Sequence, residues 1–132
     1  MSGEGATRKP GATTPLFGRV KGETESALID LGKKNPHFRP VIVRPAFVDA
    51  KGHKEIETWI PAATGIRRLE GIVSPIVRNI FPSYDSPTRA FGTFLAGLAA
   101  GQWDDDLKGD GVEVSDGMPT VNNLGFRRLM GL

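Results

Sequence analysis

The sequence contains no cysteine, and this absence removes several classes of chemistry at once. Without a thiol, the chain can form no disulfide, no thiolate zinc site and no cysteine nucleophile. It also lacks a long apolar run, since the longest, from Ala90 to Ala100, falls well short of the ~20 residues that span a bilayer. The N-terminus is polar and rich in Gly and Pro, without the apolar centre of a signal peptide. These features predict a cytoplasmic protein without a membrane span.

An excess of charge of either sign is also missing. The 132 residues include 17 Lys and Arg and 15 Asp and Glu, which gives a net charge of +2. The charges are interspersed, with no basic stripe that would follow a phosphate backbone, so nucleic acid is not an expected partner. His37 and His53 lie sixteen residues apart in polar segments without a paired carboxylate pattern, and the loop at 104–109 lacks the ligands of an EF-hand, so no metal site is expected.

A chain of this length has room for one domain with one modest core. Its clearest periodic segment predicts a helix over residues 15–34, with Thr13 or Thr14 as the N-cap and Pro15 in the first turn. Glu23 and Glu25 are expected on the polar side, opposite the apolar residues that recur at helical spacing: Leu16, Phe17, Val20, Ala27, Leu28 and Leu31.

The same helix contains glycines that need an explanation. Gly18 and Gly22 each weaken a helix by about 1 kcal/mol relative to Ala, so we interpret them as places where a neighbouring backbone comes close. After the break at Asn35-Pro36, the run Val41-Ile42-Val43 is β-branched and continuous. Such a run is typical of a parallel strand covered on both faces. A helix followed by a buried strand is half of a βαβ unit.

The rest of the chain is predicted to be mainly helical. The expected elements are, in order, a polar loop over 49–60, a helix over 62–81 interrupted at Pro75, a helix from Ser86-Pro87 to about Ala100, a polar loop over 101–111, a short strand at 112–114, and a final helix from about Pro119 to Met130.

The segment Leu16–Glu25, LFGRVKGETE, resembles the active-site helix of the short-chain dehydrogenases/reductases, whose signature is Tyr-x-x-x-Lys. It is most similar to the atypical, epimerase-like branch of that family, in which the helix reads Tyr-x-x-Val-Lys-Gly-x-x-Glu. Val20, Lys21, Gly22 and Glu25 match this pattern, and Phe17 stands in the position of the Tyr.

Further blocks follow in the order of the family. Residues 2–6 resemble the end of the preceding strand, with Ser2 near the place of the catalytic Ser, and residues 41–46 resemble the next strand and its Arg-Pro-Gly turn, with Ala46 replacing Gly. Residues 86–101 and 121–129 resemble the two terminal helices of fungal nucleoside-diphosphate-sugar-epimerase-like proteins.

The resemblance implies an NAD(P)-dependent oxidoreductase or epimerase that acts on a small molecule. In that family the Tyr exchanges a proton with the substrate, the Lys lowers the pKa of the Tyr and binds the nicotinamide ribose, and the Ser polarises the substrate oxygen. Phe17 has no ionisable proton, and losing such a group costs ~10²–10⁴-fold in rate, so we expect impaired catalysis. The implied catalytic positions are Lys21, Ser2 and Phe17, and the implied cofactor-binding residues are Lys21, Arg44, Pro45 and Ala46.

The implied fold is α/β, as the helix-rich C-terminal half of a doubly wound, Rossmann-like domain. We expect it to be incomplete, because no Gly-x-x-Gly-x-x-Gly motif follows a strand, and we expect the strand at 41–43 to lack a partner on at least one edge. The expected parts of this single partial domain, 1–132, are a loop or strand end at 1–13, an active-site-type helix plus buried strand at 14–48, and a substrate-side helical region at 49–132.

Several explanations stay open for the absence of the glycine-rich, cofactor-binding half. The chain is a truncated gene product, a fragment that pairs with another chain, or a separate small fold built from ancestral segments. The functional alternative to an impaired enzyme is a non-enzymatic interaction module, whose unpaired strand and apolar helix faces bind a partner such as a full-length homologue. A third hypothesis is a decayed product without a selected function.

Overall fold

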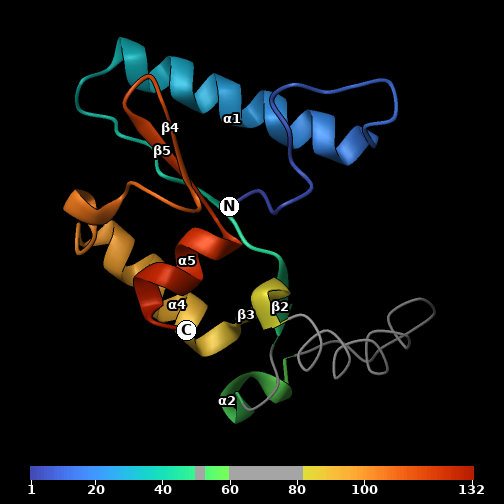
Figure 1. Cartoon of the computed structure of the whole chain (residues 1–132), viewed down its shortest axis with the longest axis vertical. Coiled ribbons are helices and arrows are strands. Elements are labelled where there is room, and N and C mark those ends of the chain that lie inside the picture. Colours follow the sequence, from blue (N-terminus) through green and yellow to red (C-terminus); the bar gives the residue numbers. More distant parts are fainter. Residues whose placement is uncertain (50–52, 60–81) are drawn as a thin grey trace.

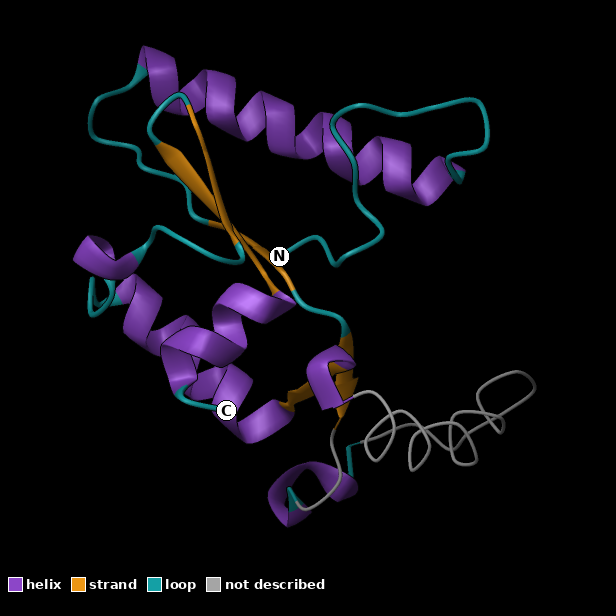
Figure 2. Ribbon diagram, in the orientation of Figure 1, coloured by secondary structure: helices purple, strands orange, loops and turns teal. Residues whose placement is uncertain are grey.

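The computed structural model describes residues 1–49, 53–59 and 82–132. In these ranges the chain has a mixed α/β fold in which one long helix covers one face of a small sheet and two shorter helices lie on the other side (Figures 1 and 2). The helix expected over 62–81 lies outside the described residues. None of the helices in the described ranges combines the length and the apolar character that a membrane span requires.

The predicted long helix, the buried strand, the helix before residue 100 and the strand at 112–114 are confirmed, and the expected loop at 49–60 contains one helical turn. The helices are α1 (Leu16–Lys34), α2 (Lys54–Glu57), α4 (Thr88–Ala99) and α5 (Asn123–Met130), with short 3₁₀ turns η1 (Pro82–Tyr84) and η2 (Asp104–Asp106); the strands are β1 (Ile42–Arg44), β2 (Phe47–Asp49), β3 (Asp85–Pro87), β4 (Val112–Ser115) and β5 (Met118–Asn122).

The main sheet has the strand order β1-β5-β4. β1 and β5 run parallel, with Val43 opposite Val121, whereas β4 and β5 form an antiparallel hairpin. The hairpin turns at Asp116-Gly117, where both residues have positive φ, 53° and 78°, as a type I′ turn requires. β2 and β3 form a separate parallel pair.

The final helix begins later than predicted. The sequence predicts a helix from about Pro119 onward, but Met118–Asn122 forms the central strand of the main sheet. The Asp116-Gly117 turn folds this segment back along β4, and the Asn122 side chain then accepts a hydrogen bond from Gly125 N at 3.0 Å. Asn122 therefore caps the helix at its true start, and the expected helix start at about Pro119 is wrong.

β1 is hydrogen-bonded on both edges, so the expectation of an unpaired edge is wrong. On the side away from β5, Ser2 N donates to Val43 O at 2.9 Å and Glu4 N donates to Pro45 O at 3.1 Å. The residue numbers rise together, so this N-terminal stub (Ser2–Glu4) runs parallel to β1. The chain therefore passes from a strand-like stub through α1 to a parallel strand.

The buried side of α1 consists mainly of glycines, with Ile29 as its apolar side chain and Glu25 as its charged one. Its buried positions include Glu25, so the prediction that Glu25 lies on the polar side is wrong. A Cβ at Gly22 would lie 1.8 Å from Thr7 O, and one at Gly18 would lie 2.5 Å from Gly5 O. The glycines thus admit the N-terminal backbone against the helix, as predicted. The full buried set is Gly18, Gly22, Glu25, Ile29 and Gly32.

The N-cap position of α1 is Pro15, without a side-chain cap, and not Thr13 or Thr14. The Thr14 hydroxyl is occupied elsewhere, because it accepts a hydrogen bond from Gly11 N at 2.9 Å. The first turn of the helix is therefore held by the preceding loop rather than by a capping hydroxyl.

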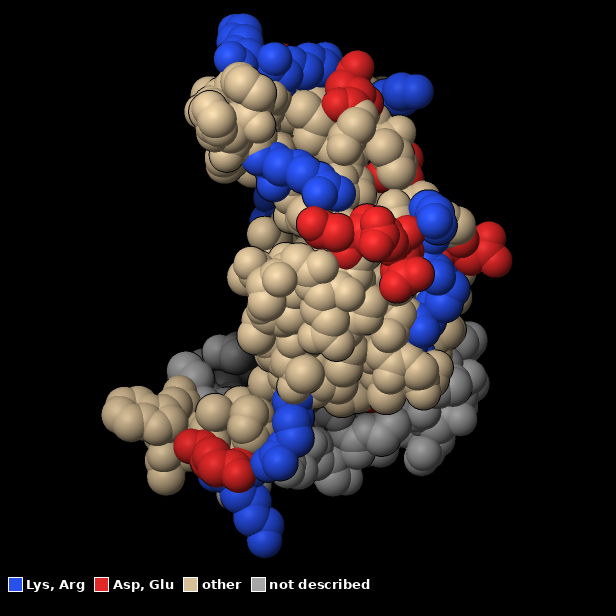
Figure 3. All heavy atoms as spheres, turned by 90° about the vertical axis from the view of Figure 1, so that its left-hand side faces the viewer, with Lys and Arg blue, Asp and Glu red and all other residues tan. Residues whose placement is uncertain are grey.

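The sheet separates two apolar clusters of different size. On the α1 side the cluster is small and consists of Ile29, Ile42 and Met118. On the other side α4 and α5 cover the larger cluster of Val43, Phe91, Phe94, Leu107, Val121 and Phe126. Figure 3 shows a face of the molecule on which acidic and basic side chains lie next to one another around a broad uncharged area.

Candidate functional site

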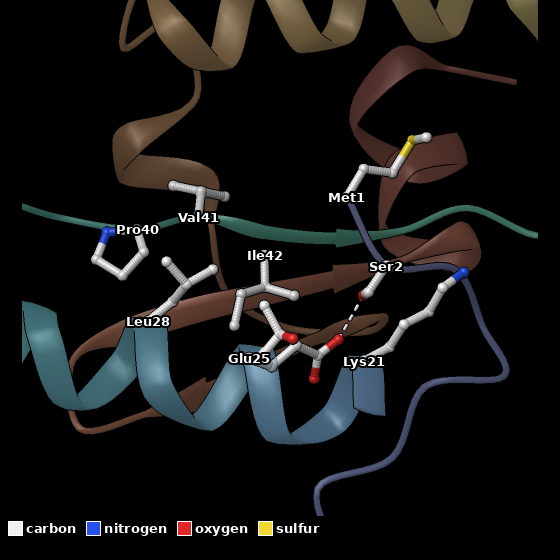
Figure 4. Close-up of a pocket in the computed structure, with 9 residues that line it drawn as sticks. Met1, Ser2, Lys21, Glu25, Leu28, Pro40, Val41 and Ile42 are labelled. Carbon is white, nitrogen blue, oxygen red and sulfur yellow. Dashed lines mark hydrogen bonds between the residues drawn. The ribbon is translucent and has the colours of Figure 1, made fainter. Parts of the chain in front are cut away.

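A cavity of about 150 Å³ lies between α1, the N-terminal stub and the chain that enters β1 (Figure 4). Two of the residues implied by the family resemblance, Ser2 and Lys21, both line it. The stub brings Ser2 to this place because its backbone is paired with β1, and α1 brings Lys21 from the opposite wall. The other lining residues are Met1, Thr24, Glu25, Leu28, Pro40, Val41 and Ile42.

Glu25 is the buried polar centre of this region, with a side chain that is 3% exposed. The Ser2 hydroxyl donates to its carboxylate, and Arg44 donates to both oxygens, from Nε at 2.9 Å and from Nη2. Burial alone raises the pKa of Glu25, but the hydrogen bonds from Arg44 and Ser2 and the charge of Arg44 together lower it below its ordinary value. Glu25 is therefore ionised at neutral pH and fixes both neighbours.

The same ion pair raises the pKa of Arg44. Its hydrogen bonds to Glu25 hold the pKa of the guanidinium above its ordinary value, despite partial burial. Paired charges of this kind position side chains more than they add net stability, because both groups lose hydration. The Glu25–Arg44 pair accordingly fixes α1 to β1 and aligns Ser2 at the cavity.

Lys21 extends from α1 past Ser2, and its amino group points away from Glu25 (Figure 4). The nearest aromatic partner is Phe17, whose ring centre lies 5.8 Å from Lys21 Nζ, as expected for positions i and i+4 of a helix. In the described ranges no carboxylate forms an ion pair with Lys21. Phe17 is 56% exposed and does not line the cavity.

The remaining residues implied as cofactor ligands lie away from the cavity. Arg44 turns to Glu25, Pro45 is buried with its carbonyl accepting the Glu4 N–H, and Ala46 is partly buried. None of the three lines the cavity. Among the four residues implied for cofactor binding, only Lys21 does.

A second buried polar group, not singled out from the sequence, surrounds Asn123 at the start of α5. The Ser86 hydroxyl donates to Asn123 Oδ1 at 2.5 Å, and Asn123 Nδ2 donates to Ser83 O at 2.5 Å. The Asn123 N–H donates to Glu4 Oε1 at 2.9 Å. Asn123 therefore ties the N-terminal stub to β3 and α5. The signal in the sequence was the Asn122-Asn123 pair, of which the first caps the helix and the second is buried.

The described residues hold no group of three or more His, Cys, Asp or Glu side chains that could bind a metal ion. The acidic turn η2 has no buried residue. One of its carboxylates, that of Asp104, instead pairs with Arg39 at 3.1 Å on the surface. This turn therefore acts as an exposed, charge-paired loop.

Comparison with known proteins identifies a relative that matches the whole chain. The chain is 50% identical to botcinic acid biosynthesis cluster B protein 16 of Botryotinia fuckeliana (strain B05.10), over an alignment of 133 residues. The chain belongs to the family of that protein. The alignment covers 100% of the chain and 84% of cluster B protein 16, so it includes every segment that builds the cavity. No family model and no solved structure matches the chain.

Proposed function

We propose that the chain is an atypical short-chain dehydrogenase/reductase of the epimerase-like kind that keeps a small-molecule site and has lost its proton transfer. The observation that carries the proposal is the shared cavity of Ser2 and Lys21, which lie on separate segments of the chain. The passage from the stub through α1 to β1, and the parallel pairing of β1 with β5, support a partial Rossmann-like, doubly wound arrangement.

The residues present fit one end of a nicotinamide cofactor better than the whole. The Lys21 ammonium can donate to ribose hydroxyls, but a cavity of about 150 Å³ is smaller than the 300–1,000 Å³ typical of ligand sites. The sequence offers no glycine-rich turn after a strand for a pyrophosphate. Lys21 is therefore the residue that would hold the nicotinamide ribose, and the bound ring would supply hydride chemistry.

The other residues at this end favour binding over catalysis. Phe17 has no proton to exchange, and the Ser2 hydroxyl is already donated to Glu25. A substrate oxygen would have to displace Glu25 from Ser2 before that hydroxyl could polarise it. The chain accordingly binds the nicotinamide–ribose end of a dinucleotide in the cytoplasm without turning it over. The name of the relative, which places it in a biosynthesis cluster, is consistent with a role in small-molecule biosynthesis.

The proposal is tested by the melting temperature of the full chain with millimolar nicotinamide mononucleotide, NADPH or AMP. A ligand at ten times its Kd adds about 1.4 kcal/mol of stability, which raises the Tm of a domain of this size by about 5 °C. We expect both nicotinamide ligands to raise the Tm and AMP to leave it unchanged. The proposed site would be refuted if neither nicotinamide ligand raised the Tm, or if AMP raised it by the same amount.

A matched pair of variants locates the effect. Lys21→Met removes the ammonium at the cavity, and Lys34→Met removes one at the exposed end of the same helix. The shift should disappear in the first variant and persist in the second. Persistence in both would show that the ligand binds elsewhere.

A second candidate function, the non-enzymatic interaction module, is favoured by the exposed face of α1. Leu16 is 77% exposed, Val20 51% and Leu31 49%. Single apolar residues on a surface need no explanation, but a continuous row of them along one helix marks an interaction surface.

A further inference from the structure

The polar side chains at the cavity differ in what each can still offer to a ligand. Ser2, Lys21, Thr24 and Glu25 line it together with apolar residues. A serine or threonine hydroxyl has one proton to donate and two lone pairs that accept, whereas an ammonium only donates and a carboxylate only accepts. The group that already receives each hydroxyl proton therefore decides which role is left for the ligand.

The proton of Ser2 is committed to Glu25. Arg44 donates to both carboxylate oxygens of Glu25, from Nε at 2.9 Å and from Nη2, and the Glu25 side chain is only 3% exposed. A carboxylate that is paired in this two-pronged way stays ionised and has no proton to give to Ser2. The Ser2 hydroxyl is therefore the donor in this pair (Figure 4), and its lone pairs are what it can offer at the cavity.

Thr24 is held in a similar way. Its hydroxyl donates to the carbonyl of Val20, one turn earlier on α1, at 2.9 Å, and a carbonyl oxygen can only accept. Both hydroxyls at the cavity thus remain available to a ligand as acceptors. Among the described side chains that line the cavity, the donor is the ammonium of Lys21, which extends past Ser2 (Figure 4).

We propose that Ser2 is a hydrogen-bond acceptor that makes the cavity select a ligand hydroxyl over a carbonyl oxygen. This role rests on the proposed binding of the nicotinamide ribose. One ribose hydroxyl accepts a hydrogen bond from Lys21 and donates its own proton to the Ser2 oxygen. A carbonyl oxygen can accept from Lys21 but has no proton for Ser2, so it leaves that oxygen unpaired. Ser2 thus determines specificity, and Glu25 positions it.

The size of the effect follows from the exposure of Ser2. A site that is built to bond a hydroxyl rejects an analogue without it, because its own polar groups are left unpaired. The rejection is strongest in a fully buried site, and Ser2 is only partly buried. The loss of this single hydrogen bond should therefore weaken binding by about five- to tenfold.

Isothermal titration calorimetry on the full chain tests the role of Ser2. The ligands are nicotinamide mononucleotide and its 2′-fluoro and 3′-fluoro analogues, in which fluorine replaces one ribose hydroxyl at nearly the same size and has no proton to donate. At least one analogue should bind the wild type about five- to tenfold more weakly than nicotinamide mononucleotide does. If neither analogue binds more weakly, the proposal is overturned without the need for any variant.

A pair of serine variants assigns the difference to Ser2. In Ser2→Ala, nicotinamide mononucleotide itself should bind about five- to tenfold more weakly, and its advantage over the fluoro analogue should shrink by the same factor. Ser26→Ala is the matched control, since the Ser26 hydroxyl donates to Gly22 O at 3.1 Å on the same helix and Ser26 does not line the cavity. It should change neither quantity.

The outcomes separate this role from the binding site as a whole. If Ser2→Ala binds nicotinamide mononucleotide as tightly as the wild type, or keeps the full difference between the ligands, the acceptor role of Ser2 is overturned while the ribose site stands. If the wild type does not bind nicotinamide mononucleotide, the ribose site and the role of Ser2 are overturned together. The Tm of unliganded Ser2→Ala confirms that a loss of binding is not a loss of the fold.

Discussion

Replacing Glu25 by Gln should destabilise the protein more than any other single change to a charged residue of α1. The substitution keeps the shape of the side chain but leaves the Arg44 guanidinium, only 17% exposed, without its counter-charge. Removing one member of a buried ion pair costs about 3–5 kcal/mol. Gln keeps one acceptor oxygen for Ser2 or Arg44, so we expect about 2–3 kcal/mol.

The dependence on pH gives a second signature of the same pair. The pKa of Glu25 is lowered in the folded protein, so its contribution to stability is fully present above the unfolded value near 4.5 and is lost as the pH falls through the folded pKa. The difference in unfolding free energy between wild type and Glu25→Gln should therefore be constant at neutral pH. It should shrink below about pH 4.5.

The assay is urea unfolding followed by tryptophan fluorescence, since the Trp103 ring packs 5.1 Å from Phe94 in the larger core. At neutral pH the loss corresponds to a Tm lower by about 7–10 °C. Glu23→Gln, exposed on the same helix, is the control and should change stability by no more than ~0.5 kcal/mol. Equal effects of the two variants, or a difference that does not change with acid, would refute the assignment of Glu25 as the ionised centre.

The remaining predictions concern packing. Gly22→Ala should lower the free energy of unfolding by about 2 kcal/mol or more, because the new Cβ would meet the Thr7 carbonyl. Gly92→Ala, where a Cβ would have nothing within 4 Å, should raise it by up to ~1 kcal/mol through helix propensity. Thermal unfolding should therefore show Tm changes of opposite sign for the two variants. Asn123→Ala should lower the free energy of unfolding by about 2–3 kcal/mol, because it leaves the Ser86 hydroxyl and the Ser83 carbonyl without the hydrogen bonds that Asn123 makes to them. Asn122→Ala, which removes only a cap, should cost about 1 kcal/mol, and an equal loss in urea unfolding would contradict the buried role of Asn123.

The elements that could be predicted from the sequence are those with a local signal. The periodicity of residues 15–34 and the β-branched run at 41–43 define α1 and β1 to within a residue or two. Pro119 favours a helix start, so the sequence predicts a helix in place of β5, although Asp116-Gly117 two residues earlier is a strong hairpin signal. The pairing of β1 with Ser2 and Glu4 could not be predicted, since it joins segments with no local relation.

The spacing of apolar residues does not by itself predict which face of α1 is buried. Apolar residues normally mark the packed side, but here the glycine side is packed, because only residues without a Cβ allow the N-terminal backbone to lie against the helix. The family resemblance points to Ser2 and Lys21. Their neighbour Glu25 was visible in the same motif, and its position on the side of Gly18 and Gly22 was the signal that it faces inward. Its pairing with Arg44 is a tertiary contact that the sequence did not reveal.

The hydrogen bond between Glu4 and Asn123 joins residues that are 119 positions apart. During synthesis, Glu4 leaves the ribosome long before Asn123 is made. The Glu4 carboxylate therefore lacks this hydrogen bond until almost the whole chain has been synthesised. Local helices such as α1 can form early, whereas closure of this contact carries a large loop-closure entropy and comes late. Nascent chains halted before Asn123 should therefore be far more sensitive to proteases than the finished protein.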